Sequence, residues 1–453
     1  MARADPDADQ LGDRGDDVKL LLVHNSYQQP GGEDQVFTSE RELLLAHGHD
    51  VVCHTAHNDE VRALGNLRLA LRTTWSHSTY RALRAAIARE RPQIVHVHNT
   101  LPLLSPAVYY AARAMGVPVV QTLHNYRLLC PKAVMLRKDR VCEDCLARLF
   151  PWPGVIHACY RDSHPATAAV AMMLGVHRLL GTWTRMVTRY VALTEFMRRK
   201  FVDGGLPPNG ITVKPNFVAR DPGVGGHGGG YALFVGRLSP EKGLRTLLQG
   251  WGRVGPRLPL KIAGAGPLET LAASSAPNVE WLGAVPHAGV LELMKRASFL
   301  VVPSESYEGF PTTVAEAFAT GLPVLASRLG AATEIVHEHR TGLFFPPGDA
   351  SGLAETVTWA LDHPARVAEM RQHARAEFQA RYTAKRNYQL LMDIYHMAMN
   401  AADDPGGRPG RDPNTAEVRD RPGHPPVHAG PPSPALPAAF ASEGAGQRAS
   451  RPR

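Results

Sequence analysis

The chain alternates short apolar runs with amphipathic helical segments, and it does so twice along its length. Helical patterns such as 80–91 separate apolar runs at 18–24, 94–98, 117–124 and 190–194 in the first half. The second half repeats the alternation, with runs at 231–236, 258–264, 279–283, 298–304, 322–327 and 342–348. Short apolar runs are typical of parallel strands buried on both faces, and the alternation favours a sheet covered by helices. The sequence therefore predicts two doubly wound, Rossmann-like α/β domains in series.

The connection between these domains is predicted at 218–230, where glycine accumulates and the periodicity is lost, as in a flexible linker. We therefore place the first domain at 18–217 and the second at 231–380. A helix at 381–400 follows and is a candidate for crossing back to the first domain. Two open α/β sheets bring the carboxyl ends of their strands to a cleft, so the ligand site is expected between the domains.

The two tails are predicted to be disordered. Residues 1–17 are acidic, and residues 401–453 are rich in Pro and Gly, so neither carries enough apolar surface to offset the entropy of ordering. The acidic start does not resemble an export signal, and the longest nearly apolar run, 166–176, is shorter than the roughly 18 residues of a membrane-spanning helix. We therefore expect a cytoplasmic protein, with peripheral contact at the inner face of a membrane as a further option.

The strongest local signal is FVGRLSPEKGLRTLLQG, in which a strand, a glycine turn and a helix follow one another. Gly236 lets a ligand approach the backbone, and Arg237 and Lys242 bracket the start of the helix, where amide groups and the helix dipole favour an anion. Diphosphate binding and solvated surface charges are both open for these two cations. One strand further on, AGAGPLETL repeats the pattern around Gly266, for which a tight turn is the simpler interpretation.

Two glutamates stand eight residues apart in SESYEGFPTTVAEAF. Thr313 and Glu316 fit the S/T-x-x-E capping box, in which the Glu side chain satisfies an amide group at a helix start. This leaves Glu308 unexplained, although it lies at the carboxyl end of a strand, where a ligand of such a sheet would bind. A metal site is disfavoured here because the segment offers no His or Cys ligand and few hard oxygen ligands.

From these residues a family resemblance follows. EGFPTTVAE, which begins at Glu308 and ends at Glu316, resembles the E-x7-E motif of retaining glycosyltransferases of the large family 4, which have the GT-B fold. The family's companion motifs arrive in order, as GRLSPEKG, AGAGP, SRLGAATEIV and TGLFFPPGD in the second half and PGGEDQV, HVHN and TLHNYR in the first. The resemblance covers roughly residues 18–399.

The resemblance implies roles for individual residues. Arg237 and Lys242 would bind the donor diphosphate and stabilise the leaving group. Glu316 would accept hydrogen bonds from the ribose hydroxyls, and Glu308 would hold hydroxyls of the donor sugar. His124 would lie against the sugar near its C6 hydroxyl. The remaining donor contacts implied by the resemblance are the turns at Gly31, Gly32, Gly236 and Gly266, the amide groups of Phe310 and Thr312, and Thr313.

The implied reaction moves a sugar from a nucleotide sugar to an acceptor hydroxyl with retained anomeric configuration, in the synthesis of a cell-surface polysaccharide, a glycolipid or a related glycoconjugate. No catalytic metal and no nucleic acid partner are expected. UDP sugars are favoured as donors and GDP sugars are kept open. The alternatives are a nucleotide-sugar epimerase or hydrolase of the same fold, which needs no acceptor alcohol, and a non-catalytic scaffold. A scaffold has no physical need for the complete set of Arg237, Lys242, Glu308 and Glu316.

Four of the five cysteines form the array C-x11-C-x2-C-x13-C, namely Cys130, Cys142, Cys145 and Cys159. Four thiolates make a tetrahedral zinc site, and clustered cysteines in a cytosolic chain are more often metal ligands than disulfides. An iron–sulfur centre would use the same ligands, and free or redox-active thiols are the alternative. The insertion 130–159 directly follows His124 and is expected to shape the acceptor side of the cleft. Cys53 is expected to be a buried strand residue.

The segment 163–201 mixes apolar positions with Arg and Lys. A surface helix that faces anionic lipid would suit a lipid-linked acceptor. A core-packing helix with a solvated face is the preferred interpretation, because the basic residues are spread over more than one element. The formal net charge of +8 is compatible with either.

Overall fold

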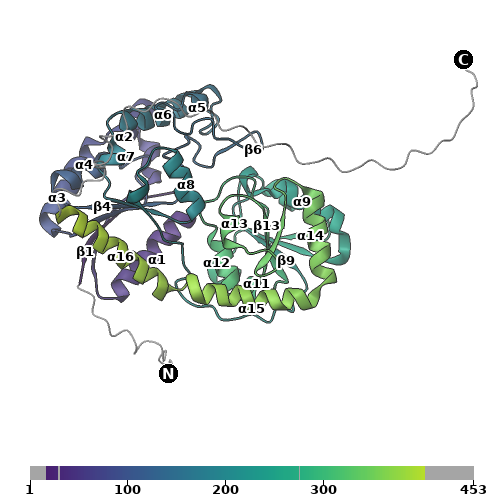
Figure 1. Ribbon diagram of the computed structural model, residues 1–453. Helices are drawn as coiled ribbons and strands as arrows, with labels where there is room; N and C mark the ends of the chain where they lie inside the picture. The colour runs from purple at the N-terminus through teal and green to yellow at the C-terminus, as the bar shows by residue number, and fades with distance from the viewer. Residues whose placement is uncertain (1–16, 29–30, 275, 404–453) are drawn as a thin grey trace, which may run out of the picture. The chain divides into compact units, whose positions relative to one another are not determined.

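Two six-stranded parallel sheets, each flanked by helices, form the framework of the protein (Figure 1). The structure is a computed structural model that describes residues 17–28, 31–274 and 276–403. The two sheets confirm the predicted pair of doubly wound α/β domains. The predicted tails 1–17 and 401–453 lie outside the described residues, apart from Asp17 and the last three residues of the final helix.

The first sheet has the strand order β2-β1-β3-β4-β7-β8. Its strands are β1 (Lys19–Ser26), β2 (Asp50–His57), β3 (Ile94–Val97), β4 (Val119–Leu123), β7 (Arg189–Ala192) and β8 (Ile211–Val213). The helices of this half are α1 (Gly32–Ala46), α2 (Asn66–Thr74), α3 (His77–Glu90), α4 (Ala107–Ala114), α5 (Trp152–Ile156), α6 (His164–Leu179), α7 (Thr182–Arg185) and α8 (Glu195–Asp203), with short 3-10 turns at Asn58–Ala63 and Pro208–Gly210. A small hairpin, β5 (Leu136–Arg137) and β6 (Arg140–Val141), lies in the insertion.

The second sheet has the strand order β11-β10-β9-β12-β13-β14. Its strands are β9 (Ala232–Val235), β10 (Leu260–Ala263), β11 (Val279–Trp281), β12 (Phe299–Val302), β13 (Val324–Ser327) and β14 (Gly342–Phe345). The helices are α9 (Leu244–Val254), α10 (Glu269–Ala273), α11 (His287–Arg296), α12 (Thr312–Ala319), α13 (Ala332–Ile335), α14 (Ala350–Asp362), α15 (Pro364–Arg381) and α16 (Ala384–Asp403), with 3-10 turns at Pro240–Lys242 and Gly255–Arg257.

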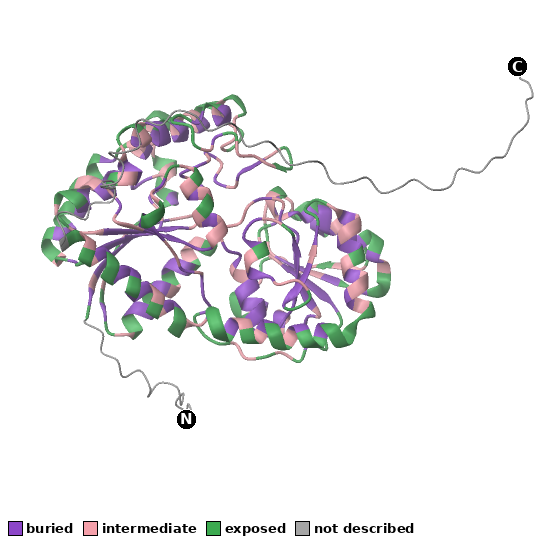
Figure 2. Ribbon diagram, viewed as in Figure 1, coloured by how far each residue is buried: buried purple, intermediate pink, exposed green. Residues whose placement is uncertain are grey.

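Both faces of each sheet are buried, as the continuous apolar runs require (Figure 2). Along β1, Leu21 and Val23 belong to one buried cluster, and Leu20 and Leu22 belong to another. Because successive side chains of a strand point to opposite faces, these two clusters lie on opposite sides of the sheet. In the second sheet, Phe234 on β9 and its neighbour Leu233 are divided between clusters in the same way.

The last helix packs against the first sheet rather than the second. Leu391, Ile394 and Tyr395 of α16 are buried in the cluster that contains Leu20 and Leu22 of β1. The Tyr395 hydroxyl lies 2.8 Å from a ring nitrogen of His96 on β3. The spacing of these apolar residues gives α16 one apolar stripe, and burial of that stripe joins the end of the chain to the first domain.

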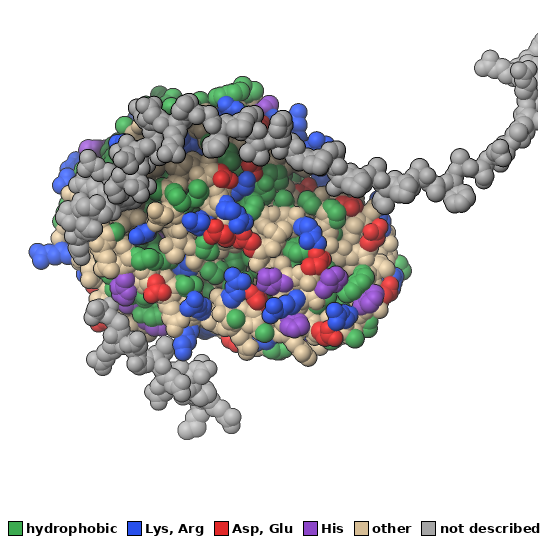
Figure 3. Space-filling view, viewed as in Figure 1, with side chains coloured by type: hydrophobic (Ala, Val, Ile, Leu, Met, Phe, Trp, Pro, Cys, Tyr) green, Lys and Arg blue, Asp and Glu red, His purple; other side chains and the backbone are tan. Residues whose placement is uncertain are grey.

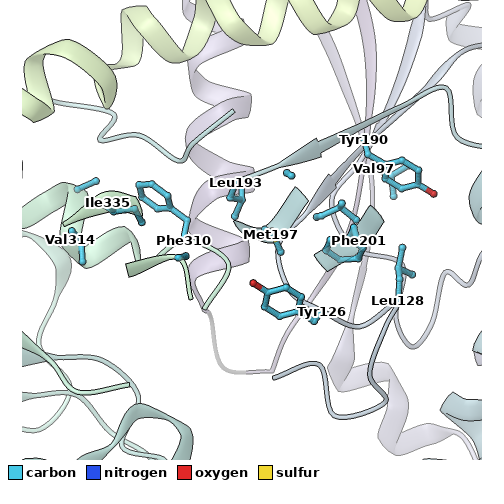
Figure 4. Close-up of a cluster of buried hydrophobic side chains, with 14 of the residues drawn as sticks. Val97, Tyr126, Leu128, Tyr190, Leu193, Met197, Phe201, Phe310, Val314 and Ile335 are labelled. Atoms are coloured by element: carbon cyan, nitrogen blue, oxygen red, sulfur yellow. The ribbon is translucent and has the colours of Figure 1, made fainter. Parts of the chain in front are cut away.

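One buried cluster contains side chains from both domains (Figure 4). Met197 and Phe201 of α8 belong to it, together with Phe310, Val314 of α12 and Ile335 of α13. Polar contacts accompany this cluster: the Tyr126 hydroxyl donates to the carbonyl of Glu308 at 3.2 Å, and the Thr194 hydroxyl donates to that of Gly309 at 3.3 Å. The loop before α12 is therefore held by residues of the first domain.

Residues 218–230 differ from the flexible connection that their glycine content suggested. The backbone amides of Gly225, His227 and Gly229 donate to carbonyl groups of the second domain at 2.8–2.9 Å. A Cβ added at Gly225 would lie 2.2 Å from the carbonyl oxygen of Lys295. Glycine therefore permits close backbone packing along this segment, and backbone hydrogen bonds hold the connection against the second domain.

The expectation that Cys53 is buried is wrong. Cys53 does lie in a strand, β2, but its side chain is exposed. The reason is that β2 is the edge strand of the first sheet and is poorly covered on both faces, so that seven of its eight residues are partly or fully exposed.

Candidate active site

The order of the strands in the second sheet reverses between β9 and β12, and the two main sequence motifs follow these two strands. In open α/β sheets the ligand crevice lies at the carboxyl ends of the strands where the order reverses. Gly243 joins the two motifs: its φ is +70°, and a Cβ there would lie 1.8 Å from the carbonyl oxygen of Pro303. The glycine therefore lets the turn before α9 pack directly on the loop after β12.

This close approach brings together Lys242 and Glu308, which are 66 residues apart in the sequence. The Lys242 ammonium nitrogen lies 2.7 Å from one carboxylate oxygen of Glu308. The Ser304 hydroxyl donates to the other oxygen of Glu308. Lys242 is about one third exposed (30%), so its charge remains accessible to a ligand. The structure thus places a cation and an oriented carboxylate side by side at the carboxyl edge of the sheet.

Arg237 is more exposed, with 61% of its side chain accessible, and its guanidinium pairs with Glu241. The Ser239 hydroxyl donates to the same Glu241 oxygen at 2.7 Å. Burial by itself would raise the pKa of Glu241, but the Ser239 hydrogen bond and the Arg237 charge together lower it. Glu241 was not among the predicted site residues, and the i,i+4 spacing from Arg237 was the signal that could have found it.

Glu316 is buried, and its carboxylate contacts two side chains that the sequence did not single out. His287, at the start of α11, lies 2.8 Å from one carboxylate oxygen of Glu316. Gln35 on α1 donates to the same oxygen at 3.5 Å. The hydrogen bond to Glu316 raises the pKa of His287 above its ordinary value. Both contacts depend on tertiary structure, so no local sequence signal pointed to them.

The predicted capping box of Thr313 and Glu316 does not form. Helix α12 begins at Thr312 with Pro311 as its N-cap, and the helix has no side-chain cap. Thr313 therefore already lies inside the first turn. The Glu316 side chain turns to His287 instead of returning to the helix start. The first-turn amide groups of Thr312 and Thr313 precede any helical carbonyl that could accept their hydrogen bonds.

The other predicted donor contacts of the second domain line this edge of the sheet. Gly236 follows β9 directly, and Gly266 follows β10 within three residues. A Cβ at Gly266 would lie 2.6 Å from the carbonyl oxygen of Leu238, so close backbone packing alone explains this glycine. The side chain of Phe310 is buried in the cluster shared by the two domains, so a donor contact of this residue would come from its backbone amide.

In the first domain, Gly31 is the N-cap of α1, and its amide donates to the Asp34 carboxylate at 2.8 Å. His24 on β1 lies 2.8 Å from the other oxygen of Asp34. Burial would raise the pKa of Asp34, but the bonds from His24, Gly31 and Tyr27 lower it. A Cβ at Gly32 meets no atom of the described protein within 4 Å, so packing within the described residues does not require glycine there.

His124 follows β4 and lies beside the loop that carries Glu308. A Cβ added at Gly309 would lie 2.9 Å from the carbonyl oxygen of His124. One His124 ring nitrogen lies 3.0 Å from a ring nitrogen of His98. Burial, together with nearby His24, His96 and Lys214, lowers the pKa of His124 to about 3. The imidazole is therefore neutral near pH 7 and presents no positive charge.

Among the described residues, one set of three potential metal ligands has all its ligand atoms within 4.8 Å of one another: Glu40, His96 and His98. Lys214 already supplies a buried cation there, because its ammonium group pairs with Glu40. Both ring nitrogens of His96 have partners at 2.8 Å, the hydroxyls of Tyr395 and Thr122. These side chains are therefore already satisfied by Lys214 and by two hydroxyl groups, and they do not form a suitable metal site.

The four clustered cysteines line a single pocket, together with Lys132, Arg137 and His157. All four thiols are free. Burial, reinforced by the neighbouring thiols, raises the pKa of Cys145 to about 12 and also raises that of Cys159. No three of the described sulfur atoms lie within 4.8 Å of one another, so they are further apart than the ligands of a closed metal site.

Exposed apolar side chains gather near this insertion. Of the 13 large apolar residues that are exposed in the described chain, ten lie on three neighbouring segments: Leu67, Leu71, Trp75, Leu149, Phe150, Trp152, Ile156, Met172, Leu179 and Leu180. Helices α2 and α5 both pack on α6, so these segments are adjacent. None of the described helices is long and apolar enough to cross a membrane. On the face shown in Figure 3, basic and acidic side chains are interspersed.

Two family models match the chain. A model described as Glycosyltransferase Family 4 matches residues 30–221, and one described as Glycosyl transferases group 1 matches residues 229–363. The first match falls on the first domain and the second on the second domain.

Individual proteins agree with these matches. A glycogen synthase from Mycobacterium tuberculosis is 28% identical over 322 residues, which cover 67% of this chain and 69% of that protein. A phosphatidyl-myo-inositol mannosyltransferase from Mycobacterium leprae is 29% identical over 222 residues, 46% of this chain and 58% of that protein. The crystal structure of Anabaena HepE in complex with UDP-glucose superposes with a TM-score of 0.60 at 16% identity and covers 84% of this chain and 100% of that chain.

Proposed function

The chain belongs to the GT-B glycosyltransferases described as family 4 and group 1, and we propose that it transfers a sugar from a nucleotide sugar to an acceptor hydroxyl with retention of anomeric configuration. The observation that carries this proposal is the pairing of Lys242 with Glu308 at the switch point of the second sheet. There a cation and an oriented carboxylate lie side by side, and Glu308 stands four residues before the first residue of α12.

In the proposed complex, Lys242 and Arg237 bind the donor diphosphate, and charge that develops on the leaving group is stabilised by these cations and by the amides of Phe310 and Thr312. Glu308 accepts hydrogen bonds from the hydroxyls of the donor sugar. The turn at Gly31 and Gly32 supports this assignment, because the described residues leave space beside Gly32 through which a ligand can approach the backbone. We assign His124 a hydrogen bond to the sugar, and its neutral imidazole beside the Glu308 loop supports this assignment.

We propose a front-face reaction. The bond between the anomeric carbon and the diphosphate oxygen breaks, and the acceptor oxygen forms its bond on the same face of the sugar. The acceptor proton passes to the departing diphosphate, so no protein nucleophile is required. The anomeric configuration of the product, read by NMR from the coupling constant of the new linkage, tests retention directly. An inverted product would contradict the mechanism and leave the transferase assignment intact.

UDP is the favoured donor nucleotide, and the UDP-glucose bound to HepE supports this choice. A thermal-shift panel of UDP-, GDP- and ADP-sugars tests it, since a ligand that binds only the folded protein raises its melting temperature. We expect the largest shift with a UDP-sugar. A larger shift with a GDP-sugar would overturn the nucleotide assignment. Donor turnover to free sugar alone would favour a hydrolase instead.

The contact between His287 and Glu316 predicts a pH effect on donor binding. The raised pKa of His287 means that its contribution to stability is complete below its ordinary pKa near 6.5 and is lost as pH rises through the higher folded value. If Glu316 binds ribose hydroxyls, the donor must replace the protonated His287. We therefore expect the donor KM of the wild type, relative to a His287→Ala variant, to fall about threefold from about pH 6 to about pH 8.

The comparison with His287→Ala separates this effect from titration of the donor phosphates, which affects both proteins equally. Steady-state kinetics at saturating acceptor measure both KM values. A ratio that stays constant across the pH range would show that donor binding does not displace His287 from Glu316.

We also propose that the acceptor is lipid-linked and that the protein docks on an anionic membrane through the ten exposed apolar residues on and directly beside α2, α5 and α6. Basic side chains accompany these residues: Arg68 on α2, Arg148 before α5 and Arg161 between α5 and α6 are exposed. The Arg148 guanidinium lies 5.2 Å from the centre of the Trp152 ring, which combines a cation with an amphipathic aromatic side chain. This combination suits an interface between lipid headgroups and acyl chains.

A triple variant, Leu149→Ser/Trp152→Ser/Ile156→Ser, is expected to bind anionic phospholipid vesicles at least tenfold more weakly than the wild type, because each apolar side chain buried in lipid contributes about 1.5–3 kcal/mol. Vesicle flotation measures the bound fraction. The matched control, Leu45→Ser/Val224→Ser/Met397→Ser, removes three exposed apolar side chains elsewhere and should bind normally. Equal loss in both variants, or no binding by the wild type, would contradict the docking surface.

A further inference from the structure

Residues 130–162 fold with very little regular secondary structure. They contain the two-residue strands β5 and β6 and the five-residue helix α5. Eight of the 12 non-glycine residues with positive φ in the described chain lie here: Ala133, Met135, Lys138, Asp139, Ala147, Ala158, Arg161 and Asp162. A residue held in this conformation costs about 1–3 kcal/mol. Something other than backbone pairing must therefore stabilise the segment.

Few residues of the segment are buried. Met135 belongs to the large hydrophobic cluster, and Cys130, Leu146 and Tyr160 pack against it, so apolar packing offsets only part of this strain. The buried residues of the segment are Pro131, Ala133, Met135, Leu136, Cys145, Pro151, Pro153 and Gly154. Folded segments with a small core are usually stabilised by disulfides or by a structural metal. Disulfides do not stabilise the segment in the described structure, because all four cysteines are free.

The four thiols come from four separate places in the segment and still meet in one pocket. Cys130 follows the turn after β4, Cys142 follows β6 directly, Cys145 lies three residues later, and Cys159 lies three residues past the end of α5. A crosslink between these positions would tie both strands of the hairpin and the helix to the first domain. The four thiols therefore share one pocket, although a bound ion would have to draw their sulfur atoms closer together.

We propose that Cys130, Cys142, Cys145 and Cys159 bind one zinc ion as four thiolates, and that this ion holds the insertion in its folded form. Thiolates are soft ligands, and a closed set of four sulfurs is typical of structural zinc. Each thiol loses its proton to solvent on binding. Four thiolates and a divalent cation leave a net charge of −2, which Lys132 and Arg137 in the same pocket offset. Binding draws the sulfur atoms closer than their described positions.

The site also has a consequence for the proposed transferase, and this step rests on the proposed function. The amide of Cys130 donates to the carbonyl of Tyr126 at 2.9 Å, and the Tyr126 hydroxyl contacts the carbonyl of Glu308. Glu143, between two of the ligands, lies 2.8 Å from the ammonium group of Lys200. Loss of zinc would therefore loosen residues that support the Glu308 loop, and donor affinity would fall secondarily.

Metal analysis of the full-length protein, purified under reducing conditions, tests the site without reference to activity. We expect about one equivalent of zinc per chain, released when a mercurial reagent modifies the thiols. Replacement of zinc by cobalt should give the visible absorption of tetrahedral thiolate coordination. Protein with no bound metal and five titratable thiols would overturn the proposal, and so would intramolecular disulfides or acid-labile sulfide from an iron–sulfur centre.

Variants identify the ligands. Cys142→Ser and Cys145→Ser are expected to lose at least 90% of the zinc, whereas Cys53→Ser, a cysteine exposed on β2, should retain all of it. His157→Ala should also retain zinc, although His157 lines the pocket. Loss of zinc from His157→Ala would overturn the four-cysteine ligand set. If the cysteine variants fail to fold, zinc release and thiol titration in the wild type still show whether the four cysteines bind zinc. Because metal content is read separately from transfer, an inactive protein with bound zinc would contradict only the proposed function.

Discussion

Replacing Lys242 by alanine is expected to lower kcat/KM for the donor by a factor of about 10²–10³, the usual effect of removing one group that stabilises charge in a transition state. The reason is position: the Lys242 ammonium lies 2.7 Å from Glu308, at the switch point of the second sheet. If the diphosphate leaves from this place, the loss falls mainly on kcat, because charge grows as the glycosidic bond breaks. Steady-state kinetics with a saturating acceptor measure the effect.

The matched control for this variant is Lys295→Ala. Lys295 also lies in the second domain and pairs with a nearby carboxylate, that of Glu292 at 2.8 Å, but it lies on α11 away from the switch point. Its replacement should leave kcat/KM unchanged. Thermal unfolding should show that both variants fold. Lys295→Ala removes a largely exposed pair that contributes at most about 1 kcal/mol, whereas Lys242→Ala leaves the partly buried Glu308 without its cation and should lower the melting temperature more. Wild-type turnover by Lys242→Ala would refute the diphosphate site.

The two sheets could be predicted because their central strands are buried on both faces and therefore read as short apolar runs. The strands that the pattern missed show why the prediction stopped there. β2 has the sequence DVVCHTAH and β8 has only three residues, and each lies at an edge of the first sheet. An edge strand needs less apolar surface, so its composition resembles that of a loop.

Some contacts of the candidate site could likewise be predicted from the sequence, and others could not. Lys242 and Glu308 could be predicted because each follows a strand, and both strands end at the same edge of one sheet. His287 and Gln35 could not, because their contacts with Glu316 depend on the packing of α11 and α1 against α12. The capping box failed for a related reason: Pro311 starts α12 at Thr312, which moves Thr313 into the helix. Local motifs therefore indicate the chemistry, while tertiary packing decides which partner each side chain finds.

Replacing Glu316 by glutamine is expected to weaken the distinction between a ribonucleotide sugar and its 2′-deoxy counterpart, because the amide oxygen still accepts a hydrogen bond but carries no charge. A carboxylate that accepts hydrogen bonds from ribose hydroxyls gains about 1.5–3 kcal/mol from each. The wild type should therefore prefer the ribose form by about 10- to 100-fold in kcat/KM, and Glu316→Gln by about 2- to 10-fold, the contribution of a neutral hydrogen bond. Glutamine keeps the shape of the side chain in its buried position, so the fold should persist.

The control is Glu280→Gln, which removes an exposed carboxylate on β11 that pairs with Lys261 and should leave the preference unchanged. An equal loss for both donors in Glu316→Gln would mean that Glu316 orients His287 and α12 without touching the ribose.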